Sequence, residues 1–161
     1  MEFPQRKPNR LQCYDYSMPG AYFLTICTEN RKNLFWRNAK AVCATARDVP
    51  LSPCGVFVEE AIQGIPLHYP AISVDHYVIM PNHIHLLLQI HPGADGRPMV
   101  APTVMTVVKQ MKGYVSKKLG TGIWQKGFHD HVIRGNADYQ EIWRYIEGNP
   151  GKWAEDKLYT P

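Results

Sequence analysis

Two histidines one residue apart, His83 and His85, are the residues whose types and spacing point most clearly to chemistry. They lie in "YVIMPNHIHLLLQI", residues 77–90, which is otherwise almost entirely apolar. Alternate side chains of a β-strand share a face, so both imidazoles would project to one side, about 7 Å apart at a rise of ~3.4 Å per residue. At that separation the two rings can converge on one cation. The alternative is a half-exposed, hydrogen-bonded pair without a chemical role.

A phenol and an amide four residues apart form the second candidate group. Tyr145 and Asn149 lie one turn apart on a predicted helix, so their side chains project from the same side. Tyr145 lies about 110° from the centre of the helix's apolar stripe, so the core does not require it. If this helix crosses the sheet face that bears the histidines, two imidazoles and the Asn149 oxygen form a three-ligand metal site. Such a site keeps open positions, as catalysis needs.

Hydrophobic periodicity predicts the elements that must position these groups. Strands are expected at residues 21–28, 71–80, 83–90 and 127–135, and helices at 55–65, at 103–119 and from Asn136 or Asp138 to Asn149. Pro66 is expected to end the first helix, and residues 33–54 are compatible with a short hairpin. This order predicts an α+β, ferredoxin-like (split βαβ) fold. Its antiparallel sheet carries two helices on one face, and an extra C-terminal helix carries Tyr145.

Composition and charge narrow the class of protein. The 161 residues are 45% hydrophobic, which suits one globular domain over residues 1–161 with an irregular arm at 1–20. No apolar run could span a membrane and the N-terminus has no signal core, so we expect a cytoplasmic protein. Four cysteines without C-x-x-C spacing indicate reduced thiols. Basic residues are in excess between residues 101 and 153, with eight Lys or Arg against four Asp or Glu. That surface is compatible with phosphate contacts or with simple solvation.

Three segments together resemble a known family. "MPNHIHLLLQI" resembles the histidine–hydrophobic–histidine (HUH) motif of single-strand DNA endonucleases. The opening "YDYSMPGAYFLTICTENR" and the closing "WQKGFHDHVIRGNADYQEIWRYIEGNP" resemble the REP-associated tyrosine transposases. The resemblance covers roughly residues 13–153 and is weakest from 38 to 55. It implies a bacterial enzyme, acting at the nucleoid, that cuts and rejoins single strands.

The resemblance also implies roles for the candidate residues. His83 and His85 would bind a divalent metal, Asn149 would complete the site, and Tyr145 would be the nucleophile that forms a 5′-phosphotyrosine link. The implied metal is Mg²⁺ or Mn²⁺, although imidazole ligands alone also suit zinc, copper or nickel. Asn82 and Gln89 are candidates for groups that support the metal ligands.

The expected partner is single-stranded DNA, in particular hairpin-forming repeats, bound by a monomer or a homodimer. Basic side chains are candidates for backbone contacts and aromatic ones for base stacking. These are Arg134, Lys109, Lys112, Lys117, Lys126 and Arg144 for the backbone, and Trp124 and Phe128 for the bases. Each aromatic can equally belong to the core, and each lysine to a solvated surface.

Three alternatives remain open at this point. Tyr114 is a rival nucleophile, although it sits at the edge of an apolar helical stripe. His129 and His131 form a second His-x-His pair, which could join the first in a four-histidine zinc site of a hydrolase that forms no covalent link. A ferredoxin-like sheet can also serve as a non-catalytic single-strand binding module.

Overall fold

The computed structural model describes residue 11 and residues 14–41, 43–93 and 103–161. One antiparallel sheet has the strand order β2-β3-β1-β4. Its strands are β1 (Gly20–Cys27), β2 (Ile72–Ile79), β3 (His83–Ile90) and β4 (His129–Val132). One helix links β1 to β2 and another links β3 to β4, which confirms the predicted α+β, ferredoxin-like fold. Most of the predicted arm at residues 1–20 lies outside the described residues.

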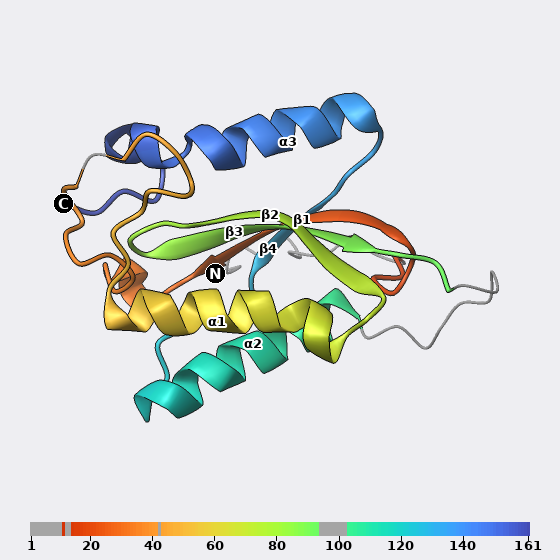
Figure 1. Ribbon diagram of the computed structural model, residues 1–161, viewed down its shortest axis with the longest axis horizontal. Coiled ribbons are helices and arrows are strands. Elements are labelled where there is room, and N and C mark those ends of the chain that lie inside the picture. Colours follow the sequence, from red (N-terminus) through yellow and green to blue (C-terminus); the bar gives the residue numbers. More distant parts are fainter. Residues whose placement is uncertain (1–10, 12–13, 42, 94–102) are drawn as a thin grey trace, which may run out of the picture.

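Helices cover the two faces of the sheet unequally. Helices α1 (Pro53–His68) and α2 (Val104–Leu119) pack side by side against one face, and α3 (Asn136–Gly148) lies across the other (Figure 1). Two short 3₁₀ segments, η1 (Glu29–Arg31) and η2 (Pro150–Glu155), follow β1 and α3. The chain therefore places its catalytic candidates in the layer opposite α1 and α2.

The main core lies between the sheet and the α1–α2 pair. Alternation along β3 directs Ile84, Leu86 and Leu88 into this layer, and all three are fully buried. They meet the apolar stripes of the two helices, which include Val58 and Val107. Because this layer meets the need for a hydrophobic core, the opposite face of β3 is free to carry polar groups.

The predicted first helix was too short. Helix α1 continues through Pro66 to His68 and does not end before the proline. A proline removes one amide donor from a helix, but here the loss falls in the last turn. The helix still closes, because the Tyr69 backbone N–H donates to the Ile65 carbonyl at 2.9 Å.

Two predicted β segments are also smaller than expected. The strand predicted at 127–135 is limited to His129–Val132, and both flanking glycines, Gly127 and Gly135, take positive φ angles of 77° and 97°. Within the described part of 33–54, an isolated antiparallel bridge between Trp36 and Leu51 replaces the hairpin.

The start of α3 differs from the prediction as well. Its N-cap is Gly135, and neither Asn136 nor Asp138 takes that position. Asp138 instead lies in the first turn, where its Oδ2 accepts the Arg134 backbone N–H at 3.0 Å. A carboxylate at this end is favoured by the helix dipole, so Asp138 stabilises the helix start from inside the helix.

Candidate active site

The two histidines of β3 converge beneath α3. His83 and His85 are buried, and their Nε2 atoms lie 3.2 Å apart. Aromatic rings enclose the pair: Trp153 stands 6.0 Å from the His83 ring, and Phe23 stacks on the His85 ring with centroids 5.2 Å apart. The sequence predicted that the rings share a face and can converge, and the structure places them so. Instead of being half exposed, they are almost completely enclosed.

Neighbouring polar groups define what each ring presents at Nε2. The Asn82 amide nitrogen donates to the Leu158 carbonyl at 2.7 Å, so its Oδ1 faces His83 Nδ1, also at 2.7 Å. His83 must therefore carry its proton on Nδ1 and present a lone pair at Nε2. His85 Nδ1 lies 2.8 Å from the Thr25 hydroxyl, which can donate or accept. When Thr25 accepts, His85 presents a second lone pair beside the first.

Burial also keeps both rings neutral. It lowers the pKa of His83 well below its usual value, and the nearby His85 and Arg31 lower it further. Burial lowers the pKa of His85 to about 3. Neutral imidazole is the form that binds metal ions, so the enclosure maintains the metal-binding form at neutral pH.

The Tyr145 phenol lies at the open side of this pair. Its ring centroid is 5.2 Å from that of His85 and 6.0 Å from that of Phe23, and the side chain remains 48% exposed. Burial raises the pKa of Tyr145, a hydrogen bond with Asn149 lowers it, and the charge of Asp156 raises it, with a net increase. Tyr145 is thus accessible to a large substrate and protonated at neutral pH.

Asn149 lies at the end of α3, and its side chain is buried. Its Oδ1 atom has no hydrogen-bond partner among the described residues. A buried amide oxygen without a partner is costly, so such an atom calls for an explanation such as an ion or water. Tyr145 and Asn149 line the same cavity, so the structure places the predicted tyrosine and amide together.

Asp156 also joins the site, although it is not among the residues predicted from the sequence. The η2 segment turns the chain back so that Asp156 Oδ2 lies 3.7 Å from His83 Nε2. The donor atoms of His83, His85 and Asp156 all lie within 4.8 Å of one another. No local pattern marks Asp156, because the turn after Pro150 and the packing of Trp153 bring it there.

A cavity of about 300 Å³ opens beside Tyr145. Asn149 and Asp156 form part of its wall, and Arg144, Lys152 and Lys157 add three basic side chains. Of the residues predicted to contact DNA, Arg144 is therefore adjacent to the site.

The other predicted DNA contacts lie elsewhere. Lys109 and Lys112 belong to α2, across the sheet from the site, and Lys112 Nζ donates to the carbonyls of Gln125 and Gly127 at 2.9 and 2.6 Å. Trp124 packs on Phe35 and donates to the Lys112 carbonyl. Arg134 follows the far end of β4, where the Ile133 N–H bonds to Ala21. These side chains keep their predicted role only if DNA extends well beyond the site.

Two further candidates can be placed. Asn82 contacts His83 directly, whereas Gln89 lies near the opposite end of β3, paired with Ala21 and Ser73. The rival Tyr114 is on α2, where its hydroxyl donates to Glu60 at 3.0 Å. Tyr114 therefore lies in the layer across the sheet from the paired histidines.

The second His-x-His pair does not join the first. His129 and His131 are exposed on β4, and His131 Nε2 lies 2.8 Å from Asp138. Over residues 14–41, 43–93 and 103–161, the histidine, cysteine and carboxylate donors that gather closely enough for a metal ion are those of His83, His85 and Asp156.

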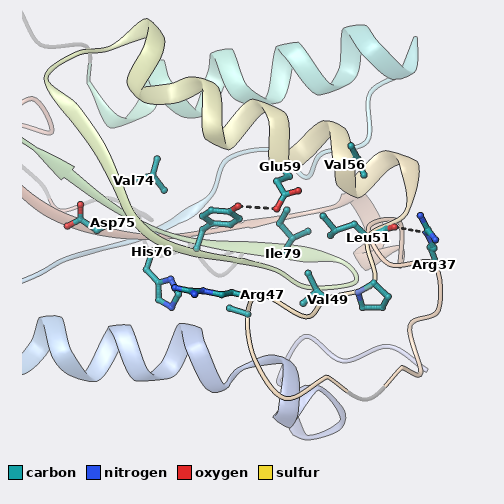
Figure 2. A pocket seen from close by; sticks show the side chains of 13 residues that line it. Arg37, Arg47, Val49, Leu51, Val56, Glu59, Val74, Asp75, His76 and Ile79 are labelled. Carbon is teal, nitrogen blue, oxygen red and sulfur yellow. Dashed lines mark hydrogen bonds between the residues drawn. The ribbon is translucent and has the colours of Figure 1, made fainter.

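A second, larger cavity lies away from the histidines. It measures about 640 Å³ and borders the edge strand β2, with Arg37, Arg47 and His76 in its wall (Figure 2). Two acidic groups of this cavity already have partners, since Glu59 accepts the Tyr77 hydroxyl and Asp75 accepts that of Tyr139. Its size alone does not make it the active site, because the converging ligand atoms are elsewhere.

Comparisons with known proteins agree with the resemblance seen in the sequence. No family model matches the chain. An uncharacterised Haemophilus influenzae protein is 29% identical over 96% of this chain and 93% of its own length. A protein of the same organism, provisionally named a REP-associated tyrosine transposase, is 26% identical over 86% of this chain and 74% of its own.

A solved structure shares the fold. It is a REP-associated tyrosine transposase bound to a REP hairpin, and it aligns with a TM-score of 0.59 over 85% of this chain and 70% of its own. At 21% sequence identity this similarity establishes the fold and not the function. Together these comparisons confirm the predicted resemblance: this chain is similar in sequence to a protein provisionally named a REP-associated tyrosine transposase, and similar in fold to a solved one.

Proposed function

We propose that this protein cleaves and rejoins single-stranded or hairpin DNA in a metal-dependent, transposase-type reaction through a 5′-phosphotyrosine intermediate on Tyr145. The observation that carries the proposal is the exposed Tyr145 phenol, whose ring lies 5.2 Å from that of a buried, neutral histidine in a converging pair. The relatives support it, since one is provisionally named a REP-associated tyrosine transposase and another was solved with a REP hairpin.

The site fits a divalent metal ion. His83 presents a lone pair, His85 can present another, and the Asn149 oxygen is buried without a partner. A mixed nitrogen and oxygen set accepts Mg²⁺ or Mn²⁺, which also suit phosphate chemistry. When bound, the cation would neutralise charge that develops on the scissile phosphate.

Tyr145 would supply the nucleophile. Its oxygen attacks the scissile phosphorus and forms the P–O bond, and the phenolic proton passes to solvent. The bond between phosphorus and the 3′ oxygen breaks, and that oxygen takes up a proton from solvent and leaves as a 3′-hydroxyl. The raised pKa of Tyr145 means that the phenol must lose its proton during the attack. A 3′-hydroxyl can reverse the step without ATP, which suits a sequence without a G-x-x-x-x-G-K-[ST] loop.

The surroundings of Tyr145 favour a single strand over a duplex. The phenol stands beside a cavity of about 300 Å³, into which one backbone can bend more readily than a stiff double helix. Arg144, Lys152 and Lys157 line this cavity and can contact the phosphates on either side of the cleavage point.

A covalent-adduct assay tests this proposal. The protein is incubated with a labelled hairpin oligonucleotide from DNA flanking its gene, with Mn²⁺, Mg²⁺ or EDTA, and resolved on a denaturing gel. With either metal we expect a labelled band that migrates more slowly than the free oligonucleotide, because the label is linked to protein. That band should be absent with EDTA and with Tyr145→Phe.

Tyr114→Phe is the matched control, because it removes a phenol from the opposite layer of the same molecule. It should form the adduct at the parent level. An adduct that persists in Tyr145→Phe and disappears in Tyr114→Phe would overturn the assignment of the nucleophile. Binding of the oligonucleotide without any adduct would favour a non-catalytic binding module instead.

A further inference from the structure

The C-terminal turn contributes a carboxylate to the paired-histidine site, and we propose that Asp156 is a direct, anionic ligand of the bound metal. The inference rests on the proposed function, because it assumes that His83 and His85 hold a cation. Asp156 lies seven residues after Asn149 in the sequence. It therefore belongs neither to the His-x-His motif nor to the helix that carries Tyr145. With it the site becomes two imidazoles, one amide oxygen and one carboxylate.

The Asp156 side chain is held in a ligand-like orientation. Its Oδ1 accepts the Leu158 backbone N–H at 2.7 Å, which fixes the carboxylate group. Its Oδ2 is thereby directed to the histidines and lies 3.7 Å from His83 Nε2. The side chain is only 7% exposed. A carboxylate that is anchored through one oxygen and directed to two imidazoles through the other needs little rearrangement to bind a metal.

Charge supports the same conclusion. Among the described residues, the nitrogen base within ion-pair distance of Asp156 is His83, whose Nδ1 proton is already accepted by Asn82 Oδ1. No described lysine or arginine forms an ion pair with this carboxylate. The charge of Lys157 acts on the carboxylate without an ion pair. A largely enclosed carboxylate that lacks a direct cationic partner is unfavourable, and a divalent cation between it and the two imidazoles would neutralise it.

The C-terminal segment also supports His83 indirectly. The Leu158 carbonyl accepts the Asn82 amide nitrogen at 2.7 Å, and Asn82 in turn fixes the His83 tautomer. The Thr160 hydroxyl donates to the Arg31 carbonyl at 3.2 Å and lies 3.0 Å from Asn33 Oδ1, which fastens the segment to the η1 region. Residues 156–160 therefore provide one ligand and orient another.

The donor set predicts which metals the site prefers. Two imidazoles with two oxygens accept Mn²⁺ and Mg²⁺, and a carboxylate favours these hard cations over softer ones. Replacing the carboxylate with an amide would keep the shape and remove the charge. It would also present an N–H donor to the His83 lone pair, which would compete with the metal.

Mn²⁺ binding to the full-length protein without DNA tests this inference. Free Mn²⁺ gives a six-line electron paramagnetic resonance signal that decreases on binding, so a titration yields the affinity. We expect Asp156→Asn to weaken binding at least about tenfold, since even the outer partners of metal ligands contribute 10–100-fold. Glu155→Gln, which removes an equal charge from the same cavity wall, should change the affinity by less than about twofold. Equal losses in the two variants would overturn the inference.

A second measurement avoids any dependence on the folding of a variant. The parent protein is labelled with ¹³C at the aspartate carboxylates, loaded with Mn²⁺ and measured by electron–nuclear double resonance. A strongly coupled ¹³C signal is expected beside the ¹⁴N couplings of the histidines. Histidine couplings without a ¹³C coupling would overturn the inference.

These experiments separate the inference from the proposed function. Mn²⁺ binding that depends on Asp156, in a protein that forms no tyrosine adduct, would support the ligand and refute the covalent reaction. If Tyr145 forms the adduct but Asp156→Asn leaves the Mn²⁺ affinity unchanged, the covalent reaction is supported and Asp156 is not a metal ligand.

Discussion

Two His-x-His pairs occur on the same sheet, and their surroundings differ completely. Strand β1 lies between β3 and β4, and its Thr25 pairs with His85 on one side and with His129 on the other. Both histidine pairs therefore project to the face that carries α3. Helix α3 packs on β2 and β3, and the pair on β3 is buried, whereas the pair on β4 remains exposed. The spacing of the motif is identical, so the covering helix makes the difference.

The two pairs also differ in how their nitrogen atoms are used. In the inner pair, His83 and His85, each Nδ1 atom contacts a supporting side chain, Asn82 or Thr25, and the two Nε2 atoms face each other. The outer pair is His129 and His131. In the outer pair, His131 Nε2 lies against the Asp138 carboxylate. A metal ligand needs one nitrogen oriented by the protein and the other available. In the pair on β3 the two Nε2 atoms lie 3.2 Å apart and share a group of close donors with Asp156, whereas the pair on β4 belongs to no such group among the described residues.

Removing each pair should give the largest contrast. We expect His83→Ala with His85→Ala to weaken Mn²⁺ binding by more than about a hundredfold, because the loss of a ligand exceeds the 10–100-fold loss of its outer partner. The tyrosine adduct should disappear with it. His129→Ala with His131→Ala should leave the affinity within about threefold. Comparable losses from the two double variants, measured by Mn²⁺ titration, would remove the distinction between the pairs.

Removing the outer partner of each pair should have a smaller effect. Asn82→Ala frees the His83 ring to change its tautomer, so the Mn²⁺ affinity should fall about 10–100-fold. Asp138→Asn, the matched change beside His131, should leave it unchanged. Because Asn82 also binds the C-terminal segment, circular dichroism should be recorded to show that Asn82→Ala is folded. A folded variant with parent-level affinity would contradict the role given to Asn82.

The inner pair should also make folding stability depend on pH. Burial lowers the pKa of His83 and His85 below the unfolded value of about 6.5. As the pH falls below that value, the unfolded chain takes up protons that the folded protein does not, so stability decreases. Two such groups give a slope of up to about 2.7 kcal/mol per pH unit.

Urea unfolding in EDTA at pH 7.5, 6.5 and 5.5 measures this slope. The decrease between the last two values should be much smaller in His83→Gln with His85→Gln. It should persist in His129→Gln with His131→Gln, whose rings are exposed in the folded protein. A parent stability that is flat between pH 6.5 and 5.5 would argue that the inner rings are not held neutral.

The smallest expected effect is on folding stability, when Asp138, the partner of His131, is replaced. Asp138→Ala removes the carboxylate that accepts the Arg134 N–H at the start of α3 and interacts favourably with the helix dipole, which should lower the free energy of unfolding measured in urea. Mn²⁺ affinity should not change. Glu141→Ala, at an exposed position on the same helix, should change stability by less than about 0.5 kcal/mol. A loss of metal binding in Asp138→Ala would mean that the two pairs are coupled.

The contrast between the pairs also shows what the sequence can predict. The alternation of 83–90 predicted that the two histidines share a face, and helical spacing predicted that Tyr145 and Asn149 share a side of their helix, because strand and helix periods fix direction. That the helix crosses the face bearing the histidines was a condition that these periods do not set. The same local rules treated His129 and His131 alike. What separates the two pairs is which strands α3 covers, and that is a tertiary property.

Other differences have similar causes. Asp156 reaches the histidines only because η2 reverses the chain, and no residue pattern specifies that path. Lys112 was predicted from its charge to contact DNA, but its ammonium group binds carbonyls of the following loop. Pro66 was read as a stop signal, although a proline in the last turn breaks little. Local chemistry therefore predicted the elements well and the long-range partners poorly.

If the Tyr145 phenol attacks DNA at the site formed by His83 and His85, the DNA must become linked to that residue, and the linked residue can be identified. The adduct formed with Mn²⁺ is digested with nuclease and trypsin, and the modified peptide is sequenced by mass spectrometry. We expect a 5′-phosphonucleotide on Tyr145, within the peptide that follows Arg144, and none when His83 and His85 are replaced. A nucleotide on Tyr114 or another residue, or an adduct that forms without the two histidines, would contradict it.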